Sequence, residues 1–276
     1  MIEIITDSCS DLSKDLMEQY HIHQVQLQVL ANGKNYLDCE LSPSELYRIV
    51  EETGQLPKTS APPVADFLKL FNNYSESIFI GISSKLSATI QSATLAAEEL
   101  DNHNIRIIDS LNLSTGIGLL VVKAAEMRDQ GLSSAEIEHT ITTLVPKVRS
   151  SFIIDTLEYM YKGGRCSAME NIVGSLLQIK PIIEVKPDGT LGVKEKIRGS
   201  RKKGLNSLLT NFKKELPDID LERVFITHTG CDEDAEYLKS ELNSLATIRN
   251  ITITRAGATI TSHCGPNTIG ILYLLK

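Results

Sequence analysis

The sequence predicts an α/β protein built from two α/β domains, the first a doubly wound, mostly parallel sheet and the second a mixed sheet with helices. In the first half of the 276-residue chain, short apolar strands alternate with helical segments, the order of a parallel sheet crossed by helices. In the second half, Pro187-Asp188-Gly189 separates two apolar segments, which predicts a hairpin and antiparallel pairing. We therefore expect domains at residues 1–150 and 151–276.

The composition argues against several classes of protein. The net charge of -7 is unfavourable for a nucleic-acid binder, because such proteins gain affinity from basic contacts to phosphate. The five cysteines are scattered and include no C-x-x-C pair, so we expect neither a disulfide framework nor a zinc site. No other metal and no cofactor are expected. The first residues turn polar at once, and no apolar run approaches the length of a membrane span. We expect a cytoplasmic protein with reduced cysteines.

Polar residues follow each predicted strand of the first half. The strands and the residues after them are 2–5 with Thr6-Asp7-Ser8, 77–82 with Ser83-Ser84, and 105–108 with Asp109-Ser110. Because the carboxyl ends of parallel strands share one edge of a sheet, we expect these side chains to gather there. Phosphatases with an aspartyl nucleophile need a second aspartate two positions on, where this chain has Cys9. We therefore interpret Asp7 as an organiser of its loop.

Turn and capping residues delimit the other elements of the first half. Residues 25–29 alternate apolar and polar side chains before an Asn32-Gly33 turn, so we expect one strand there. Ser42 and Glu45 form a capping box with Pro43 at the first helical position, which predicts the start of a helix. Further helices are expected at residues 87–100, 119–128 and 131–147.

Two hydroxyl-rich stretches, residues 58–67 and 82–93, indicate an anion site. Each places Ser or Thr at an expected junction of loop and helix, where the first N–H groups lack helical partners and the dipole favours an anion. The neighbouring residues are apolar or small and no phosphate-binding glycine loop is present, so the expected anion is a carboxylate on an apolar body. Taken alone, Thr59 and Ser60 could simply cap the next helix, and Ser92 could bond its own backbone.

In the second half, His263 lies before Gly265-Pro266 and is expected in a tight loop. There it could donate to a carboxylate or be a plain turn residue. With Ser92 or Cys264 it could form a catalytic pair, although no third member of a triad is recognisable. A stand-alone hydrolase or phosphotransferase is therefore the alternative function. Strands are expected at residues 151–154, 182–185, 190–197, 223–230 and 271–275, and an acidic helix at residues 232–244.

Two basic features of the second half have both a structural and a functional interpretation. Gly163-Gly164 before Arg165 either presents a cation to an anion or closes a helix with basic residues near its negative end. The run at residues 194–203 is the strongest positive stretch of an acidic protein. It is either a solvated face or a docking site for an acidic partner, and in the second case the protein could be a regulatory interaction module. The predicted partner contacts are Arg198, Arg201 and Lys202.

Taken together, these motifs resemble the DegV family of bacterial fatty-acid-binding proteins, the FakB-type subunits of fatty acid kinase. The resemblance covers nearly the whole chain and rests on the order and spacing of the motifs. They are Thr6-Asp7-Ser8 with Asp11-Leu12, Thr59-Ser60 with Pro62, Ile82-Ser83-Ser84 with Leu86-Ser87, Gln91-Ser92-Ala93, Asp109-Ser110, Gly163-Gly164-Arg165, Lys180-Pro181, and His263 with Gly265-Pro266.

The resemblance implies a two-domain α/β protein of the EDD fold that encloses one long-chain fatty acid, such as palmitate or oleate, in a buried apolar tunnel. Its ligand site would lie at the junction of the two domains, where Thr59, Ser92 and His263 would contact the carboxylate, with Ser60 and Arg165 nearby. The protein would catalyse nothing by itself and would present the carboxylate to a separate ATP-dependent kinase, which forms an acyl phosphate for phospholipid synthesis. We therefore expect an elongated cavity beside Ser92.

Overall fold

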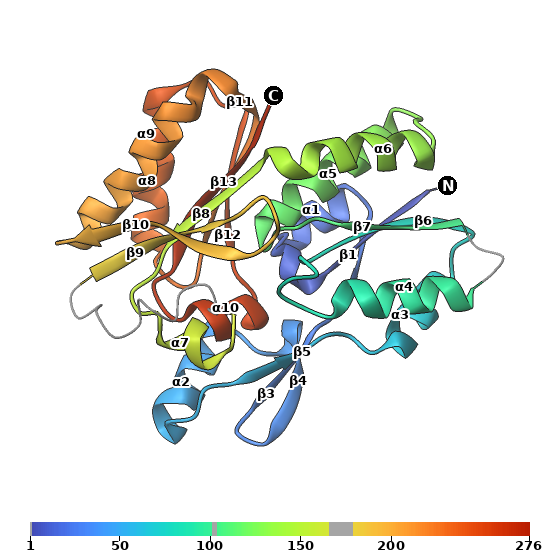
Figure 1. Cartoon of the computed structure of the whole chain (residues 1–276), viewed down its shortest axis with the longest axis horizontal. Coiled ribbons are helices and arrows are strands. Elements are labelled where there is room, and N and C mark those ends of the chain that lie inside the picture. The colour runs from blue at the N-terminus through green and yellow to red at the C-terminus, as the bar shows by residue number, and fades with distance from the viewer. Residues whose placement is uncertain (1, 101–103, 166–178) are drawn as a thin grey trace.

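The computed structural model describes residues 2–100, 104–165 and 179–276, which form three sheets with helices between and around them (Figure 1). A four-stranded sheet is built from the first half of the chain and a six-stranded sheet from the second. A three-stranded sheet lies at the bottom of the view in Figure 1. The predicted α/β class is confirmed.

The four-stranded sheet is entirely parallel and has helices on both faces. Its strands run in the order β2 (Ile22–Val25), β1 (Glu3–Asp7), β6 (Glu76–Gly81) and β7 (Asn104–Asp109). The helices are α1 (Lys14–Gln19), α3 (Val64–Phe71), α4 (Thr89–Glu99), α5 (Thr115–Asp129) and α6 (Ser134–Leu144). Alternate side chains of a strand face opposite ways. Ile5 and Phe79 therefore join a core with α3 and α4, while Ile4 and Ile78 join a core with α5, so the predicted double winding is confirmed.

Helix α5 lies between the two large sheets. It contacts β1 and β6 on one side, and β8 (Val148–Ile153), β11 (Ile219–His228) and β13 (Ile269–Leu275) on the other. Of its 15 residues, 11 are buried, as expected for a helix surrounded by protein. The two halves of the chain therefore meet along this helix.

The six-stranded sheet is mixed, as predicted. Its strands run in the order β10 (Leu191–Arg198), β9 (Ile179–Val185), β8, β13, β11 and β12 (Asn250–Arg255), and within it only β11 and β12 pair in parallel. The predicted hairpin joins β9 to β10. Helices α8 (Arg201–Glu215) and α9 (Asp232–Leu245) pack on one face. The domain boundary near residue 150 stays a prediction. Strand β8 spans that position and pairs with β13, so residues just before 150 already belong to the six-stranded sheet.

The three-stranded sheet was not predicted. Its order is β4 (Lys34–Leu37), β3 (Gln28–Ala31) and β5 (Lys58–Ser60). The single strand expected at residues 25–29 is wrong, because Leu27 donates its N–H to Ser8 Oγ (3.0 Å) and the chain leaves one sheet for another there. The Asn32-Gly33 turn is confirmed, with φ of 48° and 72°. Helix α2 (Pro43–Thr53) begins at the predicted capping box.

Two segments expected to be loops are regular structure instead. Thr59 and Ser60 lie in β5, and neither caps α3, whose N-cap is Pro63, so the predicted junction of loop and helix is wrong there. The segment around His263 forms α10 (Ala258–Cys264), with His263 in its last turn. The β-branched residues of α10 are weak helix formers, so its helical form depends on tertiary contacts.

Candidate functional site

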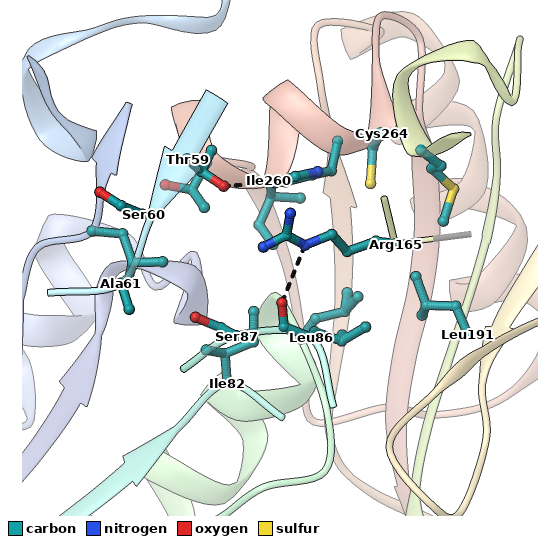
Figure 2. A pocket seen from close by; sticks show the side chains of 15 residues that line it. Thr59, Ser60, Ala61, Ile82, Leu86, Ser87, Arg165, Leu191, Ile260 and Cys264 are labelled. Carbon is teal, nitrogen blue, oxygen red and sulfur yellow. Dashed lines mark hydrogen bonds between the residues drawn. The ribbon is translucent and has the colours of Figure 1, made fainter. Parts of the chain in front are cut away.

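A small, mostly apolar cavity of about 50 Å³ lies among segments from both halves of the chain (Figure 2). The first half contributes β5 and the loop after β6. The second half contributes α10, β10 and α7 (Glu158–Lys162) with the residues that follow it. Four of the five predicted site residues line this cavity: Thr59, Ser60, Arg165 and His263.

Thr59 and His263 form a polar pair on the cavity wall. Thr59 is paired with the buried Val29 of β3, and its Oγ1 lies 2.7 Å from His263 Nε2 (dashed in Figure 2). Burial, with a smaller effect of the positive charge of Arg165, lowers the pKa of His263 from 6.5 to about 4. The imidazole is therefore neutral near pH 7 and pairs with Thr59 as one neutral group with another.

The other imidazole nitrogen, His263 Nδ1, is buried and has no hydrogen-bond partner in the described part of the chain. It faces Gly163, where an added Cβ would stand 2.5 Å from Nδ1. Gly163 closes α7, and Gly164 follows at a φ of 71°. The paired glycines therefore let the end of α7 approach His263, so one of the two predicted interpretations of this motif, a helix closed by glycine, is present.

Arg165 emerges from this helix end and reaches the cavity. Its Nε donates to the carbonyl of Leu86 (3.2 Å) and its Nη1 to the carbonyl of Gly163 (2.7 Å). No carboxylate of the described residues forms an ion pair with it. A carbonyl does not cancel a full positive charge, so the guanidinium makes this end of the cavity favourable for an anion.

Ser92 does not line the cavity. It lies in α4, partly buried, and its backbone N–H donates to the carbonyl of Ala88 (3.0 Å). The hydroxyl of this region that does line the cavity belongs to Ser87, whose Oγ lies 2.8 Å from Thr89 Oγ1. Ser87 stood in the hydroxyl-rich stretch at residues 82–93, but nothing in the local sequence separated it from Ser92.

A second cavity of about 20 Å³ adjoins the first, sharing Leu113, Ile260 and Cys264 as walls. It lies toward β11 and β13. The hydroxyls in its wall are satisfied within the protein: Thr227 Oγ1 lies 2.6 Å from Thr115 Oγ1, and Thr229 Oγ1 donates to a backbone carbonyl. The two cavities together thus run from a polar end at Thr59 to an effectively apolar end.

The alternative nucleophile Cys264 is buried, and burial raises the pKa of its thiol to about 12. A thiolate is therefore disfavoured at neutral pH. The described cysteines, Cys9, Cys39, Cys231 and Cys264, are free thiols, and Cys166 lies outside the described residues. Within the described ranges, no group of three or more His, Cys, Asp or Glu is placed to hold a metal ion. No helix in those ranges has the length and apolar character to cross a membrane.

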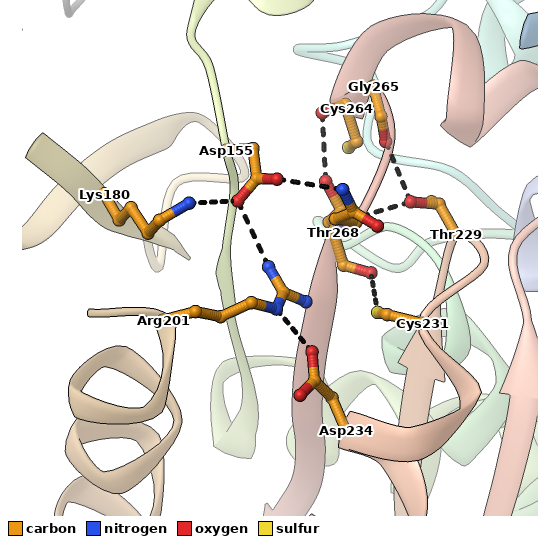
Figure 3. A network of polar contacts seen from close by, with 10 residues as sticks. Asp155, Lys180, Arg201, Thr229, Cys231, Asp234, Cys264, Gly265 and Thr268 are labelled. Atoms are coloured by element: carbon orange, nitrogen blue, oxygen red, sulfur yellow. Dashed lines mark hydrogen bonds and ion pairs between the residues drawn. The ribbon is translucent and has the colours of Figure 1, made fainter. Parts of the chain in front are cut away.

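The predicted partner contacts differ in their surroundings. Arg198 and Lys202 are exposed. Arg201 belongs to an ion-pair network instead (Figure 3), with its Nη1 3.2 Å from Asp155 Oδ1 and its Nε paired with Asp234. Lys180 Nζ and Asn267 Nδ2 also donate to Asp155, at 2.6 and 3.0 Å. Burial raises the pKa of Asp155, but these bonds and cations outweigh it and hold the pKa below its usual value.

Comparisons with known proteins place the chain in one family. The model of the family described as "Uncharacterised protein, DegV family" matches residues 1–276. A DegV domain-containing protein of Caldanaerobacter subterraneus is 34% identical over 277 residues, covering 99% of this chain and 98% of that protein.

Two solved structures have the same fold. One is a DegV family protein from Thermus thermophilus described for its fatty acid binding, with a TM-score of 0.93, 29% identity, and coverage of 100% of this chain and 99% of that one. The other is a stearic-acid-binding protein from Eubacterium ventriosum, with a TM-score of 0.86, 26% identity, and the same coverage. With a family model that matches from the first residue to the last, this protein belongs to the DegV family.

Proposed function

We propose that this protein binds one long-chain fatty acid, such as palmitate or oleate, with its carboxylate at the Thr59–His263 pair and its chain along the two adjoining cavities. The observation that carries the proposal is a hydroxyl–imidazole pair beside an arginine that lacks a described carboxylate partner, at one end of an apolar cavity. The fatty acid binding named for the Thermus thermophilus and Eubacterium ventriosum proteins supports it.

Few polar groups suffice for such a ligand. A buried carboxylate needs hydrogen-bond donors and a compensating charge. If His263 Nε2–H donates to Thr59 Oγ1, the Thr59 hydroxyl hydrogen is free to donate to the carboxylate, and Arg165 supplies the charge. The acyl chain contributes about 0.8 kcal/mol for each CH₂ removed from water. Because pockets for small molecules usually measure about 300 to 1,000 Å³, the lining side chains must move apart to admit it.

We further propose that the bound carboxylate is presented to a separate ATP-dependent kinase in the cytoplasm, and that the protein performs no chemistry alone. Ser60 supports this, because it lines the cavity and is exposed to solvent, so a partner can approach the head group there. Arg198 and Lys202 are the exposed cations proposed to contact the kinase. Arg201 is proposed to act through the ion pairs that hold the start of α8 beside them.

Organic extraction of the purified protein followed by mass spectrometry tests the binding. The expected result is about one long-chain fatty acid per chain. Protein without lipid that turns over esters or acyl phosphates would favour the enzyme that uses Ser92 or Cys264 with His263. Protein with neither lipid nor turnover would favour the regulatory interaction module.

The presentation step has its own test. In a reconstituted reaction with a fatty acid kinase and ATP, reversal of charge at Arg198 and Lys202 is expected to leave fatty acid binding unchanged and to slow acyl phosphate formation. Equal rates for the variant and the unaltered protein would remove this contact from the proposal.

A further inference from the structure

Asp38 connects the three-stranded sheet to α10. It directly follows β4, begins the short 3-10 helix η2 (Asp38–Glu40), and is only 4% exposed. Its Oδ1 accepts the backbone N–H of Thr259 (3.0 Å) in the first turn of α10. Thr259 also lines the cavity. A buried carboxylate of one sheet therefore holds the beginning of the helix whose last turn carries His263.

The Asp38–Thr259 contact and the Thr59–His263 contact both join the three-stranded sheet to α10. On one side, Thr59 of β5 pairs with Val29, and Leu37, the residue before Asp38, pairs with Gln28, so both contacts start from the same small sheet. On the other side, Thr259 and His263 are four residues apart, about one helical turn, and share a face of α10. Two connections at neighbouring turns fix both the distance and the register of the helix against the sheet.

The close approach of Asp38 to α10 is built into the backbone. Gly257, the N-cap of α10, lies beside Asp38, and an added Cβ would stand 2.8 Å from Asp38 Oδ1. Burial raises the pKa of Asp38, as expected for a carboxylate removed from water. A buried carboxyl group is an unfavourable choice for stability alone, and departures of this kind concentrate at functional sites.

We propose that Asp38 is a positioning residue for the fatty acid site: through Thr259 it sets the register of α10 so that His263 meets Thr59 in the arrangement that accepts a carboxylate. The proposal rests on the proposed function. The positioning role predicts different effects on the head group and on the acyl chain, whereas a purely structural role predicts the same effect on both. Loss of Asp38 disturbs the recognition of the head group and leaves the contacts of the acyl chain in place.

The test compares two ligands with the same chain, oleic acid and oleyl alcohol, each displacing a fluorescent fatty acid from the delipidated full-length protein. Wild type is expected to prefer the acid. Asp38→Ala is expected to lower the affinity for oleic acid by about tenfold, the value of about one good hydrogen bond. Its affinity for oleyl alcohol is expected to stay unchanged. Asp38→Asn keeps an oxygen that can accept the Thr259 N–H and is expected to stay within about threefold of wild type.

Two further variants keep the test decisive. Ser262→Ala is the matched control, because the Ser262 hydroxyl bonds to the Ala258 carbonyl within α10 and does not line the cavity; no change is expected. Gly257→Ala displaces the Asp38 carboxylate without removing it and should reproduce the selective loss, so it decides the question if Asp38→Ala does not fold.

The outcomes separate the two proposals. The positioning role would be overturned if Asp38→Ala lowered the affinities for oleic acid and oleyl alcohol equally, or lowered neither. A wild type that binds neither ligand would overturn the proposed function itself.

Discussion

Two arginines of the second half, both predicted from the sequence as functional, lie in opposite surroundings. Arg165 donates to two backbone carbonyls and lines the cavity, with no carboxylate paired to it among the described residues. Arg201 pairs with Asp155 and Asp234, and its side chain is 24% exposed. The charge of Arg165 is therefore available to a ligand, whereas that of Arg201 is already compensated.

The difference between the two arginines separates a ligand site from a purely structural ion-pair network in this molecule. Around Arg201, Asp155 receives donors from Lys180, Asn267 and Arg201 itself, and the network joins α8 and α9 to β9 and the chain after β8. Arg201 Nη2 lacks a hydrogen bond within the described residues, but two carboxylates compensate the charge of its guanidinium. Around Arg165 no described carboxylate does so, and His263 Nδ1 lacks a hydrogen bond there as well. Groups that satisfy one another stabilise the fold, and groups left without partners at a cavity wall indicate where a ligand is bound.

The largest effect on stability is expected for Arg201→Ala. Because Asp155 and Asp234 are about one-quarter exposed and lose a partner, we expect the free energy of unfolding to fall by about 1 to 2 kcal/mol, measured by urea denaturation. Fatty acid affinity should not change. Exposed Arg198→Ala is the control and should stay within about 0.5 kcal/mol of wild type. A stable Arg201→Ala variant with weak binding would reverse the comparison.

Arg165→Ala is expected to do the opposite. Fatty acid affinity should fall by about tenfold or more, since a hydrogen bond to a charged group contributes about 1.5 to 3 kcal/mol, while the stability of the protein changes little. Arg165→Lys keeps the charge and should recover part of the affinity. Titration with a fluorescent fatty acid measures both variants, and an unchanged affinity for Arg165→Ala would show that its charge does not act on the ligand.

Much of the fold follows from local patterns. Three strands of the four-stranded sheet (β1, β6 and β7), the Asn32-Gly33 turn and the capping box at Ser42 depend on neighbours in sequence, and each was predicted from them; β2 was not. β5 and α10 were missed because their stability is not local. β5 has three residues and depends on β3, and α10 depends on contacts to distant segments, including Asp11 Oδ1, which accepts the Gly257 N–H (2.8 Å).

The same limit applies to the site. A positive run can be seen in the sequence, but the carboxylates that neutralise Arg201 lie 46 and 33 residues away, so no local pattern separated Arg201 from Arg198. Thr59 and His263 are 204 residues apart, and only the resemblance to a family, not a local pattern, assigns them to one site. The contact of these residues with a carboxylate stays a prediction.

A smaller effect distinguishes two serines of the hydroxyl-rich stretch at residues 82–93. Ser87 lines the cavity and Ser92 does not, so Ser87→Ala should weaken fatty acid binding by about threefold, the scale of one modest hydrogen bond, and Ser92→Ala should weaken it less. The two variants are matched in chemistry and measured in the same titration. A larger loss for Ser92→Ala would mean that α4 moves toward the ligand on binding and would restore the contact predicted from the sequence.

The smallest effect concerns the pKa of His263. Burial first and Arg165 second lower it from 6.5 to about 4, so the unfolded chain takes up a proton between these pH values that the folded protein does not. The contribution of His263 to the free energy of unfolding therefore decreases as the pH falls from 6.5 to about 4. Arg165→Ala should raise the pKa toward 6.5, and Arg201→Ala should not. An imidazole NMR titration follows His263 separately from Asp7 and Asp11, whose raised pKa values, about 7 and 8, act in the opposite direction.

A crystal structure of the protein with bound oleate tests the central claim most directly. We predict a carboxylate oxygen within about 2.6 to 3.2 Å of Thr59 Oγ1, with the chain passing Ile260 and Cys264 toward the second cavity. A carboxylate bound elsewhere, with Thr59 still paired only to His263, would contradict the account.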